Sequence, residues 1–406
     1  MRRVTRYERV AEFYTFTGNL NTSFLEITLN SKLPYLPPSI FAMMNQLARK
    51  YDAINLAQGF PDFPADKVLL DYASEAMKLG YNQYAPMSGI YSLREAISRK
   101  IKSLYGATYD PDSSITLTTG ATQAIFTAIT AFVHQGDEVI LFKPAYDCYE
   151  PSVVANGGIP VPIQMQGKAF TIDWDHFRGK LSPKTRMVII NSPHNPSGTV
   201  FSEHDMLQLQ DSLRGTGILV LSDEAYEHLI FDGLAHQSVA RYPELASRSL
   251  LCASFGKTFH ITGWKMGYCA ASPELMAEFR KIHEFNVYAV NHPMQHALAR
   301  YLENADNYLG LPAFFQGKRD FFLSAVKDSR FKYTPSQGTY FQLLDYSEIS
   351  DEGDVAFAER LARDFGLAAI PISVFSMDGE DHRQIRFCFA KKEDTLEKAG
   401  EILRRI

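Results

Sequence analysis

Residues 254–268 read SFGKTFHITGWKMGY, and this stretch indicates both the fold class and the chemistry of the chain. It follows the apolar run RSLLCAS (248–254) and leads into a second run, GYCAAS (267–272). Short apolar runs of this kind are typical of strands that are buried on both faces of a mostly parallel sheet. Lys257 stands between them in an aromatic, glycine-rich setting. Most lysines are solvated surface charges, but a partly buried amine has a lowered pKa and can form an imine.

The same pattern continues upstream of this stretch. Helical segments lie between some of the apolar runs, for example SLREAISRKIKSLYG (92–106) and TQAIFTAITAFV (122–133), where apolar residues recur at helical spacing. Alternation of strands and helices predicts an α/β fold with a doubly wound sheet. The further apolar runs are ITLTT (115–119), EVILF (138–142), RMVII (186–190) and GILVLS (217–222).

The chain of 406 residues is long enough for two or three domains, at about 150 residues per domain. After about residue 300, short strands mix with helices, which predicts a smaller α+β domain. We therefore expect an N-terminal extension over 1–30, an arm over 31–64 that packs with the small domain, a large domain over 65–300 and a small domain over 301–406.

The composition excludes several classes of protein. Hydrophobic residues make up 46% and charged residues 21%, which are globular proportions, and the net charge of −5 favours neither a nucleic-acid binder nor a polybasic membrane anchor. No apolar run reaches the roughly 18 residues of a membrane span, and we expect no secretory signal at the N-terminus. The four cysteines lack metal or disulfide spacing. We expect a soluble, cytoplasmic enzyme without a metal.

Polar residues follow three of the predicted strands, at the edge where α/β sheets bind ligands. The turn in TTGATQAI (118–125) begins a helix with small residues and could bind an anion or be an ordinary turn. Asn195 lies in the loop NSPHNPSG, which could also be only a turn. Asp223, in SDEAYEH, could cap a helix or face a cation, and Tyr226 follows it on the same predicted face.

Together these positions meet the needs of one cofactor. Lys257 can form an imine, Asp223 can stabilise a pyridinium nitrogen, and Ser254 with the turn at 120–122 can hold a phosphate. Pyridoxal 5'-phosphate requires all three functions, whereas each feature alone is a weak signal.

The sequence also resembles the fold-type I, class I pyridoxal-phosphate aminotransferases, and within them the subgroup of bacterial methionine aminotransferases and kynurenine aminotransferases (glutamine transaminase K). The resemblance runs from about residue 31 to the C-terminus and implies a seven-stranded, mostly parallel sheet in the large domain. It rests on INLAQGFPDF, NQYAP, GATQA, PAYDCYEP, NSPHNPSG, SDEAYEH, SFGKTFHITGWK, GTYF, IPISVF and IRFCFAKK, in this order.

The resemblance implies a role for each matching residue around the cofactor ring. Lys257 would hold the cofactor covalently and move the proton during the reaction. Asp223 would pair with the ring nitrogen, Asn195 and Tyr226 would hydrogen-bond the phenolic oxygen, and Tyr146 would stack on the ring.

For the phosphate, the resemblance implies binding by Ala121, Thr122, Ser254 and Lys265. Many members of the family carry arginine in place of Lys265, so the phosphate would meet a point charge here. Tyr84 would reach the phosphate of a neighbouring subunit, which implies a homodimer with shared active sites. On its own, Tyr84 would be interpreted as a core residue, and the match to NQYAP reverses that interpretation.

For the substrate, the resemblance implies that Arg386 clamps the α-carboxylate, since its planar fork grips a carboxylate with two hydrogen bonds. Asn195 would assist, and Gly59 would bring a backbone N–H near the same group. Kynurenine-type enzymes tend to present an aromatic–histidine pair where this chain has Val290 and Asn291, which favours the methionine aminotransferase version.

We therefore predict a ping-pong transfer of an amino group from an apolar or aromatic L-amino acid, methionine first, to a 2-oxo acid. Aromatic residues are the candidates for the side-chain pocket, and apolar pockets discriminate modestly. A kynurenine or glutamine aminotransferase and a cysteine-conjugate β-lyase are the alternatives on the same scaffold. A non-catalytic sensor of a transcription regulator would need a DNA-binding domain upstream. The pocket candidates are Phe60, Tyr84, Tyr146 and Phe375.

Overall fold

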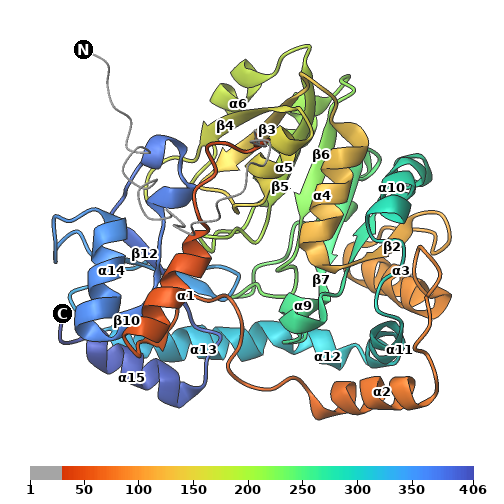
Figure 1. Cartoon of the computed structure of the whole chain (residues 1–406). Coiled ribbons are helices and arrows are strands. Elements are labelled where there is room, and N and C mark those ends of the chain that lie inside the picture. Colours follow the sequence, from red (N-terminus) through yellow and green to blue (C-terminus); the bar gives the residue numbers. More distant parts are fainter. Residues whose placement is uncertain (1–29) are drawn as a thin grey trace, which may run out of the picture.

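A seven-stranded sheet lies at the centre of the computed structural model, which describes residues 30–406 (Figure 1). The strand order is β2-β8-β7-β6-β5-β3-β4, and only β8 runs antiparallel to its neighbours. The predicted α/β fold with a mostly parallel sheet is confirmed. The strands are β2 (Ile115–Thr118), β3 (Glu138–Lys143), β4 (Ile159–Gln164), β5 (Thr185–Asn191), β6 (Leu219–Asp223), β7 (Ser249–Ser254) and β8 (Gly267–Ala270).

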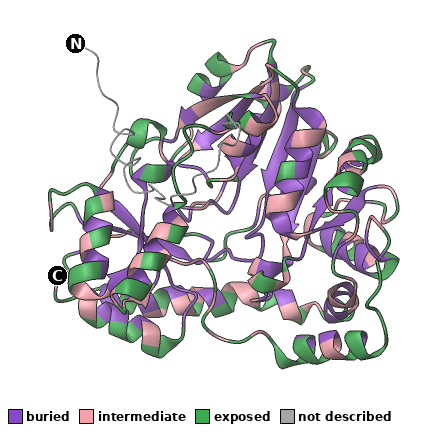
Figure 2. Ribbon diagram, viewed as in Figure 1, coloured by how far each residue is buried: buried purple, intermediate pink, exposed green. Residues whose placement is uncertain are grey.

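Hydrophobic clusters cover both faces of this sheet, as the continuous apolar runs predict. In β3, Leu141 belongs to one cluster and its neighbours Ile140 and Phe142 belong to the other. Figure 2 shows the strands buried and the helices with one face exposed. Helices α4 (Gly120–Phe132), α5 (Tyr149–Ala155) and α10 (Pro273–Asn286) cover one face, and α3 (Tyr91–Tyr105), α6 (Trp174–Lys180), α7 (Glu203–Leu213), α8 (Pro243–Ala246) and α11 (His292–Tyr301) cover the other.

Strand β4 is missing from the apolar runs of the sequence, and its prolines explain why. Pro160 and Pro162 interrupt the β-forming pattern, and a proline cannot donate a hydrogen bond to a neighbouring strand. The strand lies at the edge of the sheet and pairs on one side only, with β3. An edge strand tolerates proline because the missing N–H can face away from the sheet.

Two smaller sheets lie in the C-terminal part of the chain. β11 (Ile370–Pro371), β12 (Gln384–Cys388) and β9 (Phe341–Asp345) form an antiparallel sheet. The N-terminal arm joins this part, since β1 (Ile54–Asn55) pairs with β10 (Leu367–Ala368). The boundaries of the two domains stay a prediction, and the extension over 1–30 lies outside the described residues except for its last one. The helices here are α1 (Ile40–Lys50), α13 (Leu311–Val326), α14 (Asp354–Phe365) and α15 (Glu393–Leu403).

The remaining helices are α2 (Lys67–Lys78), α9 (Phe255–Thr258) and α12 (Asp306–Leu309). Across residues 30–406, no helix combines the length and the apolar character that crossing a bilayer requires. In the same range, no group of three or more His, Cys, Asp or Glu side chains is arranged to hold a metal ion.

Candidate active site

Lys257 lies in the single-turn helix α9, directly after β7. Its Nζ donates a hydrogen bond to the carbonyl of Gly59 at 3.2 Å, and lies 6.0 Å from the ring centroid of Tyr226 and 5.8 Å from that of Tyr340. Burial lowers the pKa of this amine to about 8. A much larger fraction of the amine is therefore neutral at pH 7 than for a lysine in water, and a neutral amine is both a nucleophile and a base.

Asp223 is the last residue of β6 and lies beside Asn191 of β5 and Cys252 of β7. Tyr149 donates its hydroxyl to Oδ2 at 2.6 Å, and the N–H of Ala225 donates to Oδ1 at 3.0 Å. Burial raises the pKa of this carboxyl. Within the described part of the chain, Asp223 forms no ion pair, although it is only 5% exposed. A buried carboxylate without a cation is suited to a cationic ligand.

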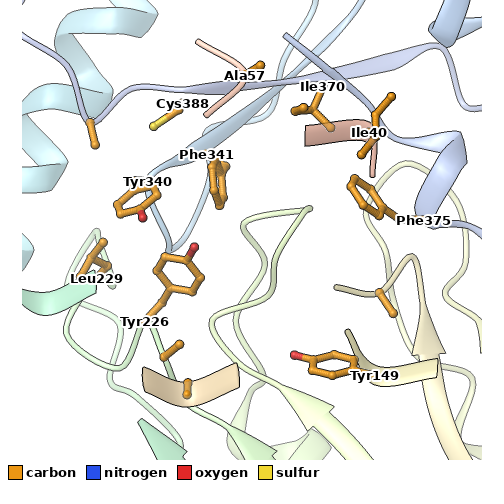
Figure 3. Close-up of a cluster of buried hydrophobic side chains, with 14 of the residues drawn as sticks. Ile40, Ala57, Tyr149, Tyr226, Leu229, Tyr340, Phe341, Ile370, Phe375 and Cys388 are labelled. Carbon is orange, nitrogen blue, oxygen red and sulfur yellow. The ribbon is translucent and has the colours of Figure 1, made fainter. Parts of the chain in front are cut away.

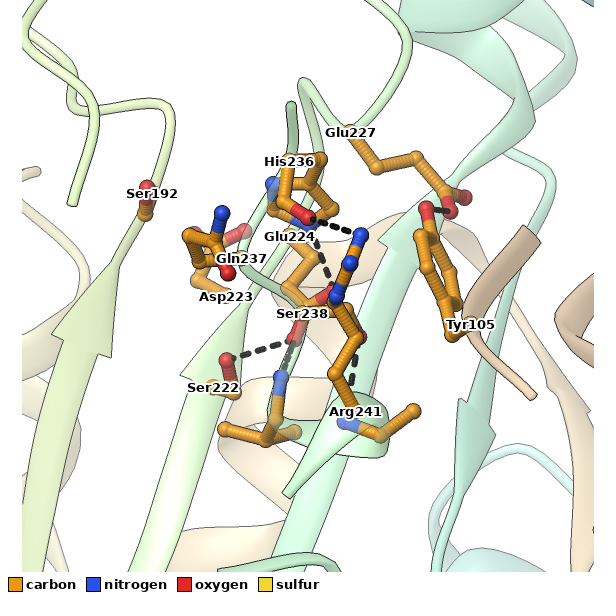
Figure 4. Close-up of polar contacts among 12 residues, drawn as sticks. Tyr105, Ser192, Ser222, Asp223, Glu224, Glu227, His236, Gln237, Ser238 and Arg241 are labelled. Carbon is orange, nitrogen blue, oxygen red and sulfur yellow. Dashed lines mark hydrogen bonds and ion pairs between the residues drawn. The ribbon is translucent and has the colours of Figure 1, made fainter. Parts of the chain in front are cut away.

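The other two carboxylates of this segment, those of Glu224 and Glu227, are paired with other groups, and part of these contacts is drawn in Figure 4. Glu224 accepts hydrogen bonds from Ser222 at 2.9 Å and from the N–H of Val239 at 3.0 Å, and its other oxygen pairs with His236. Glu227 forms a buried ion pair with Lys100 through one carboxylate oxygen, and its other oxygen accepts a hydrogen bond from the Tyr105 hydroxyl. These contacts anchor the segment that carries Asp223 and Tyr226.

Arg386 lies in β12 and is 1% exposed. Its Nη1 donates to Oδ1 of Asn195 at 2.6 Å and its Nη2 to the carbonyl of Ala57 at 3.2 Å. The guanidinium stacks on the ring of Phe341 at 3.8 Å and lies 5.4 Å from that of Phe41.

The charge of Arg386 has no counterpart among residues 30–406. No carboxylate there lies within ion-pair distance of its guanidinium, and its buried Nε has no hydrogen-bond partner. Burial lowers its pKa to about 10, so the group stays charged at neutral pH. A buried, charged fork with an unused donor is suited to bind the carboxylate of a ligand.

An aromatic cluster formed by Tyr226, Tyr340 and Phe341 (Figure 3) contacts both Lys257 and Arg386. Tyr226 contacts Tyr340 edge-to-face, with ring centroids 5.2 Å apart, and Tyr340 contacts Phe341 at 5.0 Å in the same manner. Burial raises the pKa of the Tyr226 phenol, so this group stays protonated at neutral pH and can donate a hydrogen bond. Tyr340 donates its hydroxyl to the carbonyl of Gly59.

Gly59 is required where it lies, because an added Cβ would come within 2.8 Å of the Phe341 ring. Its carbonyl accepts hydrogen bonds from both Lys257 and Tyr340. The predicted role for its N–H in substrate binding stays a prediction.

The residues predicted to bind phosphate meet at the first turn of α4. Ala121 and Thr122 lie in this turn, and the Lys265 amine comes within 3.7 Å of the position that a Cβ would take on Gly120. Ser254 accepts a hydrogen bond from the N–H of Lys257 at 3.4 Å. Free N–H groups at a helix start, a hydroxyl and an ammonium are groups suited to bind an anion. Thr122 and Lys265 also line a cavity of about 380 Å³, together with Phe126 and Asn286.

Tyr146 and Tyr84 are placed differently. Tyr146 is partly buried, and its hydroxyl lies 3.5 Å from that of Thr122, so it belongs to this group of residues. Tyr84 is 83% exposed and contacts the ring of Tyr288 edge-to-face at 5.5 Å. It is therefore not a core residue of the described chain.

Several residues that contact this site were not predicted from the sequence. Tyr149 follows Tyr146 by three residues, which would have placed both on one side of a helical turn. Tyr340 and Phe341 lie in the GTYF stretch of the resemblance, but nothing local assigned them a role. No local signal marks the carbonyl of Ala57, which contacts a residue more than three hundred positions away.

The fold and this site define an α/β enzyme of amino-group chemistry. A family model described as "Aminotransferase class I and II" matches residues 51–403. The chain belongs to this family, and the predictions of an enzyme and of an aminotransferase are confirmed.

Solved structures and characterised relatives agree with this assignment. The chain is 48% identical to the methionine aminotransferase of Escherichia coli (strain K12), over 93% of this chain and 98% of the relative. A crystal structure of YbdL from Escherichia coli, described as identifying a methionine aminotransferase function, matches with a TM-score of 0.91 and 47% identity over 94% of this chain and 100% of the other. The kynurenine--oxoglutarate transaminase of Dictyostelium discoideum is 32% identical over 91% of this chain and 94% of the relative.

Proposed function

We propose that this aminotransferase uses pyridoxal 5'-phosphate to move an amino group from an apolar or aromatic L-amino acid to a 2-oxo acid by a ping-pong mechanism. Methionine is the proposed first donor. The proposal includes a homodimer with shared active sites that acts in the cytoplasm.

One observation carries the proposal. The carbonyls of Ala57 and Gly59, two residues apart, bind the guanidinium of Arg386 and the amine of Lys257. The guanidinium of Arg386, which can bind a carboxylate, and the amine of Lys257, whose pKa is lowered, therefore contact the same short segment. An α-amino acid bound through its carboxylate to Arg386 would present its α-carbon toward Lys257.

The residues fit the cofactor. Asp223 is a buried carboxylate without a cation, and Lys265 with the first turn of α4 is suited to a phosphate. When bound, the cofactor supplies an electron sink for the electrons of the substrate Cα–H bond. Asp223 would keep the ring nitrogen charged, and Tyr226 with Asn195 would hydrogen-bond the phenolic oxygen.

Lys257 then moves the proton of the reaction. Its Nζ would accept the proton of the substrate Cα and later release it, for which a pKa of about 8 is well matched. Arg386 and Asn195 hold the carboxylate and fix the orientation of the α-carbon. The aromatic rings of Tyr226, Tyr340 and Tyr146 limit the access of water.

The aromatic surroundings support an apolar donor. Phe41 and Phe341 flank Arg386, and Phe375 lies 5.8 Å from Phe41, measured between ring centroids. Such walls favour methionine and aromatic side chains over a second carboxylate. The similarity to a methionine aminotransferase supports the same choice, and the similarity to a kynurenine transaminase supports kynurenine as the second candidate donor.

The test is an absorbance spectrum of the purified protein before and after L-methionine is added without an acceptor. Loss of the visible band of the bound cofactor, with release of the methionine 2-oxo acid, is the expected result. A band that methionine leaves unchanged would move the donor to kynurenine or glutamine. Release of pyruvate and ammonia from a cysteine conjugate would instead favour a β-lyase. No band after addition of pyridoxal phosphate would contradict the proposal.

Exposed aromatic residues support the proposed dimer. Tyr84 is 83% and Phe285 88% exposed, and Tyr288 beside Tyr84 is 46% exposed. The cavity next to Lys265 offers a place for Tyr84 of a second copy to approach the phosphate. Analytical ultracentrifugation should give twice the mass of the chain, and Tyr84→Phe should weaken cofactor binding about tenfold without dissociating the dimer. A monomer that binds the cofactor fully would contradict this proposal.

A further inference from the structure

Lys391 is a buried lysine that the proposed mechanism does not use. It is 3% exposed, and no carboxylate among residues 30–406 forms an ion pair with it. Its Nζ donates a hydrogen bond to the carbonyl of Phe60 at 2.8 Å and lies 4.8 Å from the centroid of the Phe60 ring. A buried ammonium without a counter-charge is costly, so an apolar side chain would serve better if Lys391 only filled space.

The partner of Lys391 belongs to segment 57–62, which borders the active site. Three carbonyls of this segment accept hydrogen bonds from three cationic side chains. Ala57 binds Arg386, Gly59 binds Lys257, and Phe60 binds Lys391. Arg386 and Lys257 belong to the proposed active site. Lys391 does not, but it binds the same segment.

A second contact holds the far end of the segment. The Asp62 carboxylate accepts hydrogen bonds from the backbone N–H of Lys392 at 2.6 Å and from the Thr395 hydroxyl at 2.8 Å. Lys392 is the N-cap residue of α15, and its own side chain does not cap the helix. Asp62 thus caps α15 from another part of the chain, next to the contact that Lys391 makes.

We propose that Lys391 is a positioning residue for substrate recognition, which holds Phe60 and Gly59 against the site through segment 57–62. This inference rests on the proposed function. Lys391 acts on the affinity for the substrate carboxylate and side chain, and not on the proton transfer at Lys257. Asp62 acts in the same direction from the other end of the segment.

The central test uses Lys391→Met, which keeps the length of the side chain and removes the charge and the donor. The KM for methionine should rise about tenfold with kcat within about twofold of wild type, because one hydrogen bond from a charged donor is lost. The cofactor absorbance and the melting temperature should stay at or above those of wild type. Lys391→Arg, which keeps charge and donor, should recover most of the affinity.

Lys392→Met is the matched control. It removes the adjacent positive charge, but the side chain is exposed and forms no hydrogen bond or ion pair with segment 57–62. Its KM should stay within about twofold of wild type.

Asp62→Ala separates positioning from a simple charge effect. If Lys391 only attracted the substrate carboxylate, removal of a nearby negative charge would tighten binding. If both residues hold the segment, Asp62→Ala weakens binding, and the double variant with Lys391→Met costs little more than the worse single variant.

Calorimetric binding of the carboxylic acid that is methionine without its amino group gives a readout without turnover. We expect wild type to bind it about ten times more tightly than Lys391→Met. Equal affinities in these two proteins would overturn the inference. If the wild-type enzyme binds the acid but does not convert methionine, the proposed donor is contradicted. The comparison of affinities between wild type and Lys391→Met remains valid in that case.

Discussion

Two regions of the active site are built in different ways. The sheet-edge region, with Asp223 and Lys257, follows neighbouring strands of one continuous sheet, β6 and β7. The bridging region, with segment 57–62 and Arg386, is held together by contacts between parts of the chain that are far apart in sequence. Atoms on one rigid sheet keep their geometry, as proton transfer requires. Contacts across segments can give way, and we expect them to control affinity.

Lys257→Ala tests the sheet-edge region most severely. Transamination should fall by at least about a thousandfold, since both the covalent anchor and the base of the proton transfer are lost. The visible band of the bound cofactor should disappear in an absorbance spectrum. Retained activity in this variant would contradict the role of Lys257.

Asp223→Asn tests the same region by charge alone. The amide keeps the shape and can still contact Tyr149, but it cannot hold a positive charge on the cofactor ring. We expect kcat to fall roughly 10²–10³-fold, in the range of a lost electrostatic contact in a buried site. Steady-state kinetics with saturating methionine measure this, and a kcat near wild type would contradict the assignment.

Glu227→Gln is the matched control for Asp223→Asn, because Glu227 is as buried as Asp223 and lies in the same segment. Although burial would raise its pKa, Lys100 and Tyr105 hold the pKa of Glu227 at about 2. This carboxylate is already paired, so its loss should lower the free energy of unfolding by about 3 kcal/mol and change kcat far less than Asp223→Asn does.

Arg386→Lys tests the bridging region. A point charge cannot reproduce the planar fork, and the contact with Phe341 is also weakened. We expect the kcat/KM for methionine to fall roughly thirtyfold, about 2 kcal/mol, mostly through KM. The cofactor spectrum should not change. A fall in kcat equal to that in kcat/KM would mean that the two regions are not separable.

The difference between the regions also explains what could be predicted from the sequence. Lys257 and Asp223 each follow an apolar run, so one local pattern places both at the same sheet edge. The contact between Arg386 and Ala57 has no local signature, because it depends on how the arm packs against the C-terminal strands. Tyr340 was missed for the same reason, since it acts through a partner on a different element.

The burial of Lys257 gives the last test, in the cofactor-free protein. Its pKa in the folded protein is lowered from 10.5 to about 8, so between these values the unfolded state binds more protons and stability rises with pH. Below about pH 8 the folded state carries the full cost of the buried charge, about 3 kcal/mol. Lys257→Met removes that cost. In urea denaturation, the variant should exceed wild type in stability by up to this amount at pH 7, and the difference should shrink as the pH approaches about 10.5. A difference that is constant across this range would show that the amine is not desolvated, and that the sheet-edge region does not prepare Lys257 before the cofactor binds.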